Sequence, residues 1–132
     1  MMGMSTTDKS NKMANTRQKG KNGEDQAAEW LERLGYRILE RNWYCRRKEI
    51  DLIAMEGEEL VVVEVKLRRA PMLERPEQAI NREKQRSLVF AANSYVRMKH
   101  IRAEVRFDVI FVIGYPDRDE ILHIRRAFYP SW

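Results

Sequence analysis

Two apolar segments on either side of a long helical pattern constrain the fold of this chain most strongly. Residues 60–66 and 105–113 are each strand-sized and carry apolar side chains on both faces. A strand that is apolar on both faces belongs in the interior of a sheet covered on both sides. A helix predicted from Pro76 to about Lys99 joins the two strands, which makes them parallel and the crossover right-handed. The pattern therefore predicts an α/β fold.

The rest of the chain predicts the order of the other elements. A helical stripe over residues 23–34 precedes expected strands over 36–43 and 49–55, a turn over 56–59, and a short last strand over 120–124. The order α-β-β-β-α-β, with one further strand, predicts a mixed β-sheet flanked by helices. We expect a disordered basic tail over residues 1–20 and a single domain over residues 21–132.

The net charge of +5 comes mainly from the expected tail. Residues 1–22 contain five basic side chains and one acidic one, which leaves 20 basic and 19 acidic side chains in the remaining 110 residues. The expected domain is therefore nearly neutral. The tail either adds a weak, salt-sensitive attraction to phosphate backbones or only keeps the protein soluble.

Cysteine content and hydropathy limit the compartment. The lone cysteine, Cys45, excludes an internal disulfide and a cysteine-only zinc site. No apolar run reaches membrane-spanning length, and the N-terminus lacks the apolar stretch of a secretory signal. We expect a cytoplasmic protein without a membrane partner.

Three charged residues occupy positions in expected strands that are otherwise apolar. Asp51 lies in the strand over 49–55, and Glu64 and Lys66 lie near the end of the strand over 60–66. Because side chains alternate along a strand, a turn of two or of four residues places all three on one face. The four-residue turn sets Asp51 directly opposite Glu64, and Glu49 opposite Lys66.

This cluster predicts a metal site. Neighbouring carboxylates repel one another unless a cation neutralises them, and Mg²⁺ (or Mn²⁺) prefers oxygen ligands. Lys66 could position or deprotonate an attacking water, or neutralise the transition state. Basic residues suited to phosphate flank the same end of the hairpin, namely Arg46, Arg47, Lys48, Arg68 and Arg69. The alternative is a solvated Glu–Lys pair of little energetic value, which suits an apolar strand less well.

Several stretches resemble the YraN-type family. They are Gly23-Glu24, residues 49–54, residues 62–66, Lys84 and residues 106–109. Members are small bacterial proteins regarded as endonuclease-like members of the PD-(D/E)XK nuclease superfamily, related in fold to archaeal Holliday-junction resolvases. The resemblance covers about residues 20 to 115 and implies a restriction-endonuclease-like fold.

The resemblance also implies roles for individual residues. Asp51 and Glu64 match metal ligands, and Lys66 completes the catalytic group. Glu24 resembles an additional metal ligand, although an acid in the first turn of a helix is also favoured by the helix dipole. Lys84 could reach phosphate, or bury its stem and keep its head in solvent.

Two further positions carry expectations of their own. Arg106 and Asp108 are expected to form a structural ion pair. Relatives usually have glycine where this chain has Lys48, so the start of the strand over 49–55 could differ.

These observations lead to two hypotheses of different classes. The first is a metal-dependent endonuclease that acts on DNA, with branched or damaged structures as candidate substrates. The second is a non-catalytic nucleic-acid-binding or scaffold module that retains the nuclease fold. The sequence does not give the oligomeric state, but related resolvases are dimers, so the resemblance leaves a homodimer open.

Overall fold

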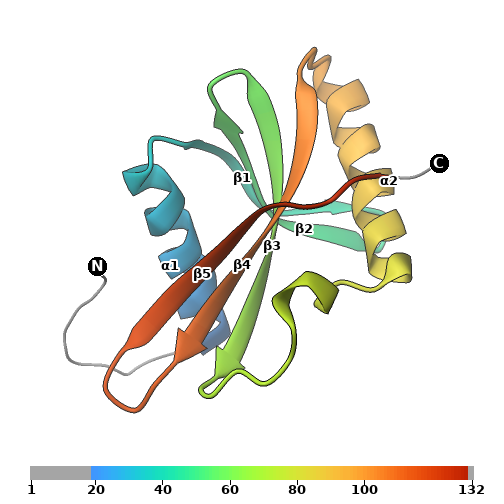
Figure 1. Cartoon of the computed structure of the whole chain (residues 1–132). Coiled ribbons are helices and arrows are strands. Elements are labelled where there is room, and N and C mark those ends of the chain that lie inside the picture. The colour runs from blue at the N-terminus through green and yellow to red at the C-terminus, as the bar shows by residue number, and fades with distance from the viewer. Residues whose placement is uncertain (1–18, 131–132) are drawn as a thin grey trace.

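A computed structural model describes residues 19–130 as a five-stranded sheet with a helix packed on each face (Figure 1). The elements are α1 (Lys19–Arg33), β1 (Arg37–Cys45), β2 (Lys48–Glu56), β3 (Glu59–Arg69), the 3₁₀ helix η1 (Pro76–Gln78), α2 (Arg82–Lys99), β4 (Glu104–Gly114) and β5 (Asp119–Phe128). Residues 1–18 and 131–132, which include most of the predicted disordered tail, lie outside the described residues.

The sheet has the predicted mixed topology. Its strand order is β1-β2-β3-β4-β5, and only β3 and β4 are parallel. Between β2 and β3, Glu56 faces Glu59 and Leu52 faces Val63, which is the register predicted for the four-residue turn. The α/β fold class and the parallel central pair are therefore confirmed.

The central strands are apolar on both faces because a separate hydrophobic layer covers each one. Leu60 and Val62 pack in one layer with buried residues of α2, such as Ala91. Val61 and Val63 pack in the other layer with buried residues of α1, such as Leu31. Alternate residues of β3 thus enter different cores, which accounts for the pattern from which the fold was predicted.

Strands β2 and β3 separate before either strand ends. Their pairing stops at Leu52 and Val63. Below that point β2 still pairs with β1 as far as Lys48, and β3 still pairs with β4 as far as Arg69. The sheet consequently splits into two branches, and we call this opening the fork. Asp51 and Glu64 are the first residues beyond the last β2–β3 pair.

Several element boundaries differ from the sequence-based expectation. The helix predicted from Pro76 is interrupted: η1 is a single turn, and α2 begins only at Arg82. Asn81 caps α2, because its side-chain oxygen accepts a hydrogen bond from the Lys84 N–H at 2.8 Å. Helix α1 begins earlier than residue 23, and strands β3 and β5 are longer than expected.

None of the helices within residues 19–130 has the length and apolar character needed to cross a membrane.

Candidate functional site

Three carboxylates from α1 and β2 converge at the fork. Glu24, Glu49 and Asp51 each offer one oxygen, and these oxygens lie within 4.8 Å of one another. An ion such as Mg²⁺ holds oxygens at about 2.1 Å, so ligands on opposite sides of it are about 4.2 Å apart. The residue types and their spacing therefore fit a hard divalent cation.

Asn42 holds two of these carboxylates in place. Its Nδ2 donates hydrogen bonds to Glu24 Oε1 at 3.0 Å and to Glu49 Oε2 at 2.8 Å. Asn42 has a φ of 51°, a backbone conformation that asparagine tolerates better than most residues. The sequence-based reasoning missed Asn42, and the available signal was an asparagine within a strand, where this residue is depleted. It also expected Glu49 opposite Lys66, whereas Glu49 joins Glu24 and Asp51.

The carboxylate of Asp51 fills the fork. Its Oδ2 accepts a hydrogen bond from the Val65 N–H at 2.8 Å, beyond the point where β2 and β3 stop pairing. Burial and the nearby charge of Glu64 raise the pKa of Asp51 to about 7, although the Val65 N–H opposes the shift. A bound cation would favour the ionised form of this carboxyl, so the site is electrostatically prepared for positive charge.

Glu64 faces two lysines. Its Oε2 lies 3.6 Å from Lys66 Nζ and 3.7 Å from Lys84 Nζ. The Glu64 side chain is 9% exposed, whereas that of Lys84 is 40% exposed, so Lys84, in the first turn of α2, is the partner that solvent reaches more easily. Asp51, Glu64 and Lys66 thus lie together at the fork, as the strand alternation predicted. Glu64 acts on Asp51 through its charge and stands beside the group of three carboxylates, not within it.

The side chains of Arg46 and Lys48, where β1 turns into β2, lie over α2. Arg46 Cζ and Lys48 Nζ are 5.9 and 5.5 Å from the ring centroid of Phe90. Arg47, between them, is exposed. Arg46 has a φ of 60°, whereas Lys48 is not among the described residues with positive φ. Lys48 therefore starts β2 without the positive φ that would favour glycine there.

The two arginines after the Glu64–Lys66 segment have different environments. Arg68 forms a two-pronged ion pair with Glu74, in which Nη2 donates to Oε2 at 3.1 Å. Arg69 is exposed and forms no ion pair with the side chains that the structure describes. Of these two arginines, Arg69 is the one whose charge is not already neutralised.

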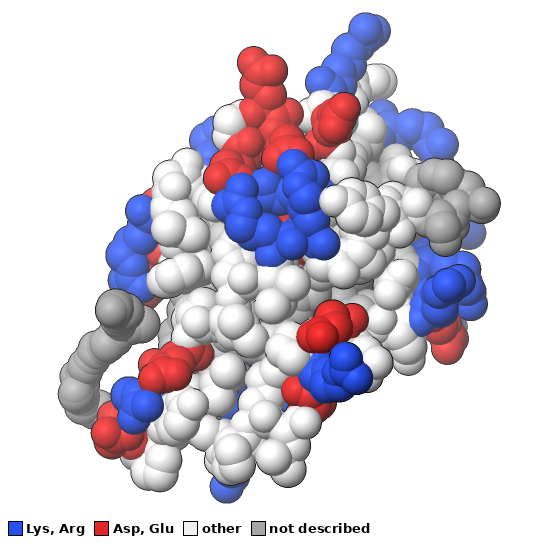
Figure 2. Space-filling view, in the orientation of Figure 1, with Lys and Arg blue, Asp and Glu red and all other residues white. Residues whose placement is uncertain are grey.

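Arg106 and Asp108 form the expected structural ion pair, which is buried. Arg106 Nε lies 3.0 Å from Asp108 Oδ1, and Arg106 is 2% exposed. Arg106 Nη1 also donates to Glu56 and Glu59 at the closed end of the β2–β3 hairpin, remote from the fork. Figure 2 shows basic and acidic side chains gathered over this hairpin and β5, where Arg125 and Arg126 form further pairs with the same two glutamates.

Comparison with known proteins gives consistent matches over this region. The family model "Uncharacterised protein family UPF0102" matches residues 23–112, which include every carboxylate and lysine of the fork. A UPF0102 protein of Phocaeicola vulgatus is 40% identical over 118 residues, covering 89% of this chain and 98% of the relative. One from Bacteroides fragilis is 43% identical over 111 residues (84% and 92%). One from Geobacter sulfurreducens is 45% identical over 111 residues (83% and 87%).

Proposed function

The chain belongs to the YraN family, UPF0102, and because that name assigns no activity we propose a function from the site: a metal-dependent endonuclease that hydrolyses phosphodiester bonds in DNA. The observation that supports this most is the fork itself. It gathers three carboxylates within ligand distance of one another, beside a buried glutamate that two lysines contact. A group of this kind has no evident use in packing.

The proposed cation is Mg²⁺ or Mn²⁺, with Asp51 and Glu24 as ligands. Glu49 lies within the same group, and Glu64 borders it from β3. Such an ion, when bound, lowers the pKa of a water ligand and offsets negative charge on the phosphate oxygens. The protein orients the ligands through Asn42 and the Val65 N–H, which fix three of the carboxylates before any ion arrives.

Lys66 is the proposed catalytic partner of the carboxylates. Its Nζ lies 3.6 Å from Glu64 Oε2, and this contact holds the side chain at the fork. From there it orients the attacking water and stabilises charge that develops on the phosphate. Lys84, which contacts the same oxygen of Glu64, is in position to hold a non-reacting phosphate oxygen.

The proposed partner is DNA, held by Arg46, Arg47 and Lys48 on one side of the fork and by Arg69 on the other. Arg68 contributes less, since Glu74 already neutralises it. Because Glu64 is only 7% exposed, a phosphate in regular duplex has poor access to the fork. Branched or damaged DNA is therefore the proposed substrate class. The proposed location is the cytoplasm, and the resemblance to resolvases supports a homodimer.

A cleavage assay tests this function. The purified protein is incubated with linear, nicked, flapped and four-way-junction DNA in Mg²⁺, in Mn²⁺ or in EDTA. We expect metal-dependent cleavage that Asp51→Asn and Lys66→Ala each reduce by about a hundredfold or more, since each removes a group that acts in the transition state. Glu58→Gln and Lys99→Ala are the matched controls, because they make the same charge changes at exposed positions away from the fork.

The opposite result is equally informative. The enzymatic hypothesis would be wrong if the protein bound DNA but cleaved none of these substrates, and if Asp51→Asn and Lys66→Ala left that binding unchanged. That result would favour the non-catalytic nucleic-acid-binding or scaffold module.

A further inference from the structure

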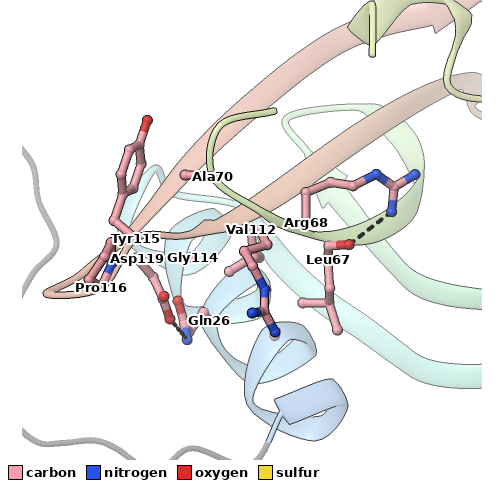
Figure 3. Close-up of a pocket in the computed structure, with 11 residues that line it drawn as sticks. Gln26, Leu67, Arg68, Ala70, Val112, Gly114, Tyr115, Pro116 and Asp119 are labelled. Carbon is pink, nitrogen blue, oxygen red and sulfur yellow. Dashed lines mark hydrogen bonds between the residues drawn. The ribbon is translucent and has the colours of Figure 1, made fainter. Parts of the chain in front are cut away.

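A pocket of about 560 Å³ lies where the parallel strands β3 and β4 end (Figure 3). Its walls are the last residues of β3 and β4, the turn into β5, and one side of α1 at Gly23 and Gln26. In open α/β sheets, ligands bind in crevices at the carboxyl ends of such strands. The position of this pocket is therefore that of a ligand site, and the fork does not include it.

The pocket and the fork are neighbours, and the contact between Gly23 of α1 and Leu67 of β3 lies between them. Gly23 lines the pocket and precedes Glu24, whereas Leu67 lines it and follows Lys66. A Cβ on Gly23 would lie 2.0 Å from Leu67 Cδ2, so the Leu67 side chain lies directly against the helix at this glycine. Lys66 projects from the face of β3 that α2 covers, whereas Leu67 and Arg69 project from the face that α1 covers. The two sites are therefore joined along α1, where Gly23 lines the pocket and the next residue, Glu24, belongs to the fork. A nucleic-acid strand that reaches Glu24 needs few further nucleotides to enter the pocket.

The walls of the pocket combine an apolar surface with polar groups. Leu67, Ala70 and Val112 supply apolar surface. Opposite them, Gln26 Nε2 donates a hydrogen bond to Asp119 Oδ2 at 2.9 Å, as the dashed line in Figure 3 shows. An apolar surface beside the Gln26 amide suits a nucleobase, which has flat faces and an edge of donors and acceptors.

A guanidinium group at the pocket suits a phosphate. Arg69 lines the pocket and has no ion pair with any described side chain. Figure 3 shows Arg68, by contrast, directed away from Gln26 and Asp119, and it is paired with Glu74. Arg69 is thus the residue that can hold the phosphate of a nucleotide whose base enters the pocket.

Resting on the proposed function, we infer that this pocket holds one unpaired nucleotide of the DNA substrate, next to the phosphate at the fork. Its base lies against Leu67 and Val112, and its phosphate contacts Arg69. A base that remains stacked in a duplex cannot enter. The site therefore selects DNA that has a single-stranded arm over blunt duplex of the same length.

A binding experiment in EDTA tests this selection without cleavage. Fluorescence anisotropy compares a blunt duplex with the same duplex carrying a short single-stranded arm, and 2-aminopurine in the arm reports whether its base leaves the stack. Wild-type protein should bind the armed duplex about tenfold more tightly, because contact with aliphatic side chains should give the lower end of the range known for bases stacked on aromatic rings. Arg69→Ala and Gln26→Ala should each remove most of that ratio. Arg97→Ala makes the same charge change as Arg69→Ala at an exposed position of α2, and it should leave the ratio intact.

The ratio of the affinity for the armed duplex to the affinity for the blunt duplex distinguishes this inference from the proposed function. The inference would be wrong if wild type, Arg69→Ala and Gln26→Ala gave equal ratios, or if the 2-aminopurine signal did not change on binding. Either result would show that the pocket does not hold the base, and neither would argue against cleavage at the fork. Asp51→Asn, in turn, should keep the preference for the arm while it loses cleavage. A wild-type protein that never cleaves DNA but keeps the Arg69-dependent ratio would overturn the nuclease and leave the pocket standing.

Discussion

At the scale of single residues, the carboxyl group of Asp51 carries an electrostatic penalty in the metal-free protein. Burial, together with the charge of Glu64, raises its pKa to about 7. An acid with a raised pKa holds its proton more tightly in the folded than in the unfolded chain. The protonated Asp51 carboxyl therefore contributes its full stabilisation of the folded protein below pH 3.8, and this stabilisation is lost as the pH rises through about 7.

Asp51→Asn should consequently stabilise the metal-free protein. At pH 8 the variant avoids the buried charge, and we expect a gain in the free energy of unfolding on the order of 2 kcal/mol. At pH 5 the gain should be smaller, because wild-type Asp51 is then protonated in the folded state. Urea denaturation in EDTA at both pH values measures the difference, and Glu58→Gln, at an exposed acid on the same hairpin, should change little at either pH.

The same substitution should remove stabilisation by metal. Mg²⁺ or Mn²⁺ should raise the melting temperature of the wild type more at pH 8 than at pH 6, since protons compete for the ligands. Asp51→Asn should show little of this effect. If Asp51→Asn destabilises the metal-free protein at pH 8, the buried charge is not the penalty described above.

The positions of some fork residues could be predicted from the sequence, whereas those of others could not. Asp51, Glu64 and Lys66 could be grouped because strand alternation alone puts them on one face. Asn42 could not, because its contacts depend on a positive φ within β1 and on a helix packed across the strand. The proximity of the Glu49 carboxylate to that of Glu24 likewise depends on how α1 packs against the sheet.

At the scale of elements, the beginning of α2 determines where Lys84 points. Asn81 accepts the Lys84 N–H, which places Lys84 in the first turn, 3.7 Å from Glu64. The sequence predicted a helix start at Pro76 because proline suits both the first turn of an α-helix and a 3₁₀ turn. The true cap is an asparagine without the glutamate or glutamine that usually marks such a position three residues later.

Asn81→Ala should destabilise the protein by about 1 kcal/mol, the usual effect of losing an N-cap side chain. Asn81→Ser keeps an oxygen that can accept the same hydrogen bond and should restore most of the loss. Urea denaturation of the three proteins measures both effects. Equal destabilisation by alanine and serine would show that the asparagine acts through something other than the cap.

The fork is the element-scale feature that the sequence did not reveal. The register of the β2–β3 hairpin followed from its turn, and the structure confirms it. Apolar alternation nevertheless continues in β3 beyond Val63, so no local signal ends the pairing. The pairing ends where the Asp51 side chain, not a β2 carbonyl, takes the Val65 N–H.

At the scale of the whole molecule, one buried arginine connects segments from most of the sheet. Arg106 of β4 donates hydrogen bonds to Asp108, Tyr36, Glu56 and Glu59. Burial alone would raise the pKa of Asp108, but hydrogen bonds from His123, Arg106 and the Arg126 N–H outweigh it and lower the pKa. The ion pair itself was foreseeable from the sequence, whereas its other partners come from three separate segments.

Arg106→Ala should therefore destabilise the protein by about 3–5 kcal/mol, because it leaves Asp108 buried without its main cation. Arg118→Ala breaks ion pairs of an arginine side chain that is 46% exposed, and should cost less than about 1 kcal/mol. Urea denaturation at pH 7 compares the two variants. A loss for Arg106→Ala no larger than that for Arg118→Ala would contradict the role given to this network.

The parallel pairing of β3 with β4 has a consequence for biosynthesis. Residue 59 faces residue 104, so a long loop must close before the central strands can meet. Helix α1 packs on both strands through Val63 and Ile110, so we expect Glu24 to take its place only once the two strands are joined. If the proposed metal site is correct, we therefore expect that a chain still on the ribosome can bind the cation only after β4 has emerged. Partly translated copies would then lack the proposed nuclease activity.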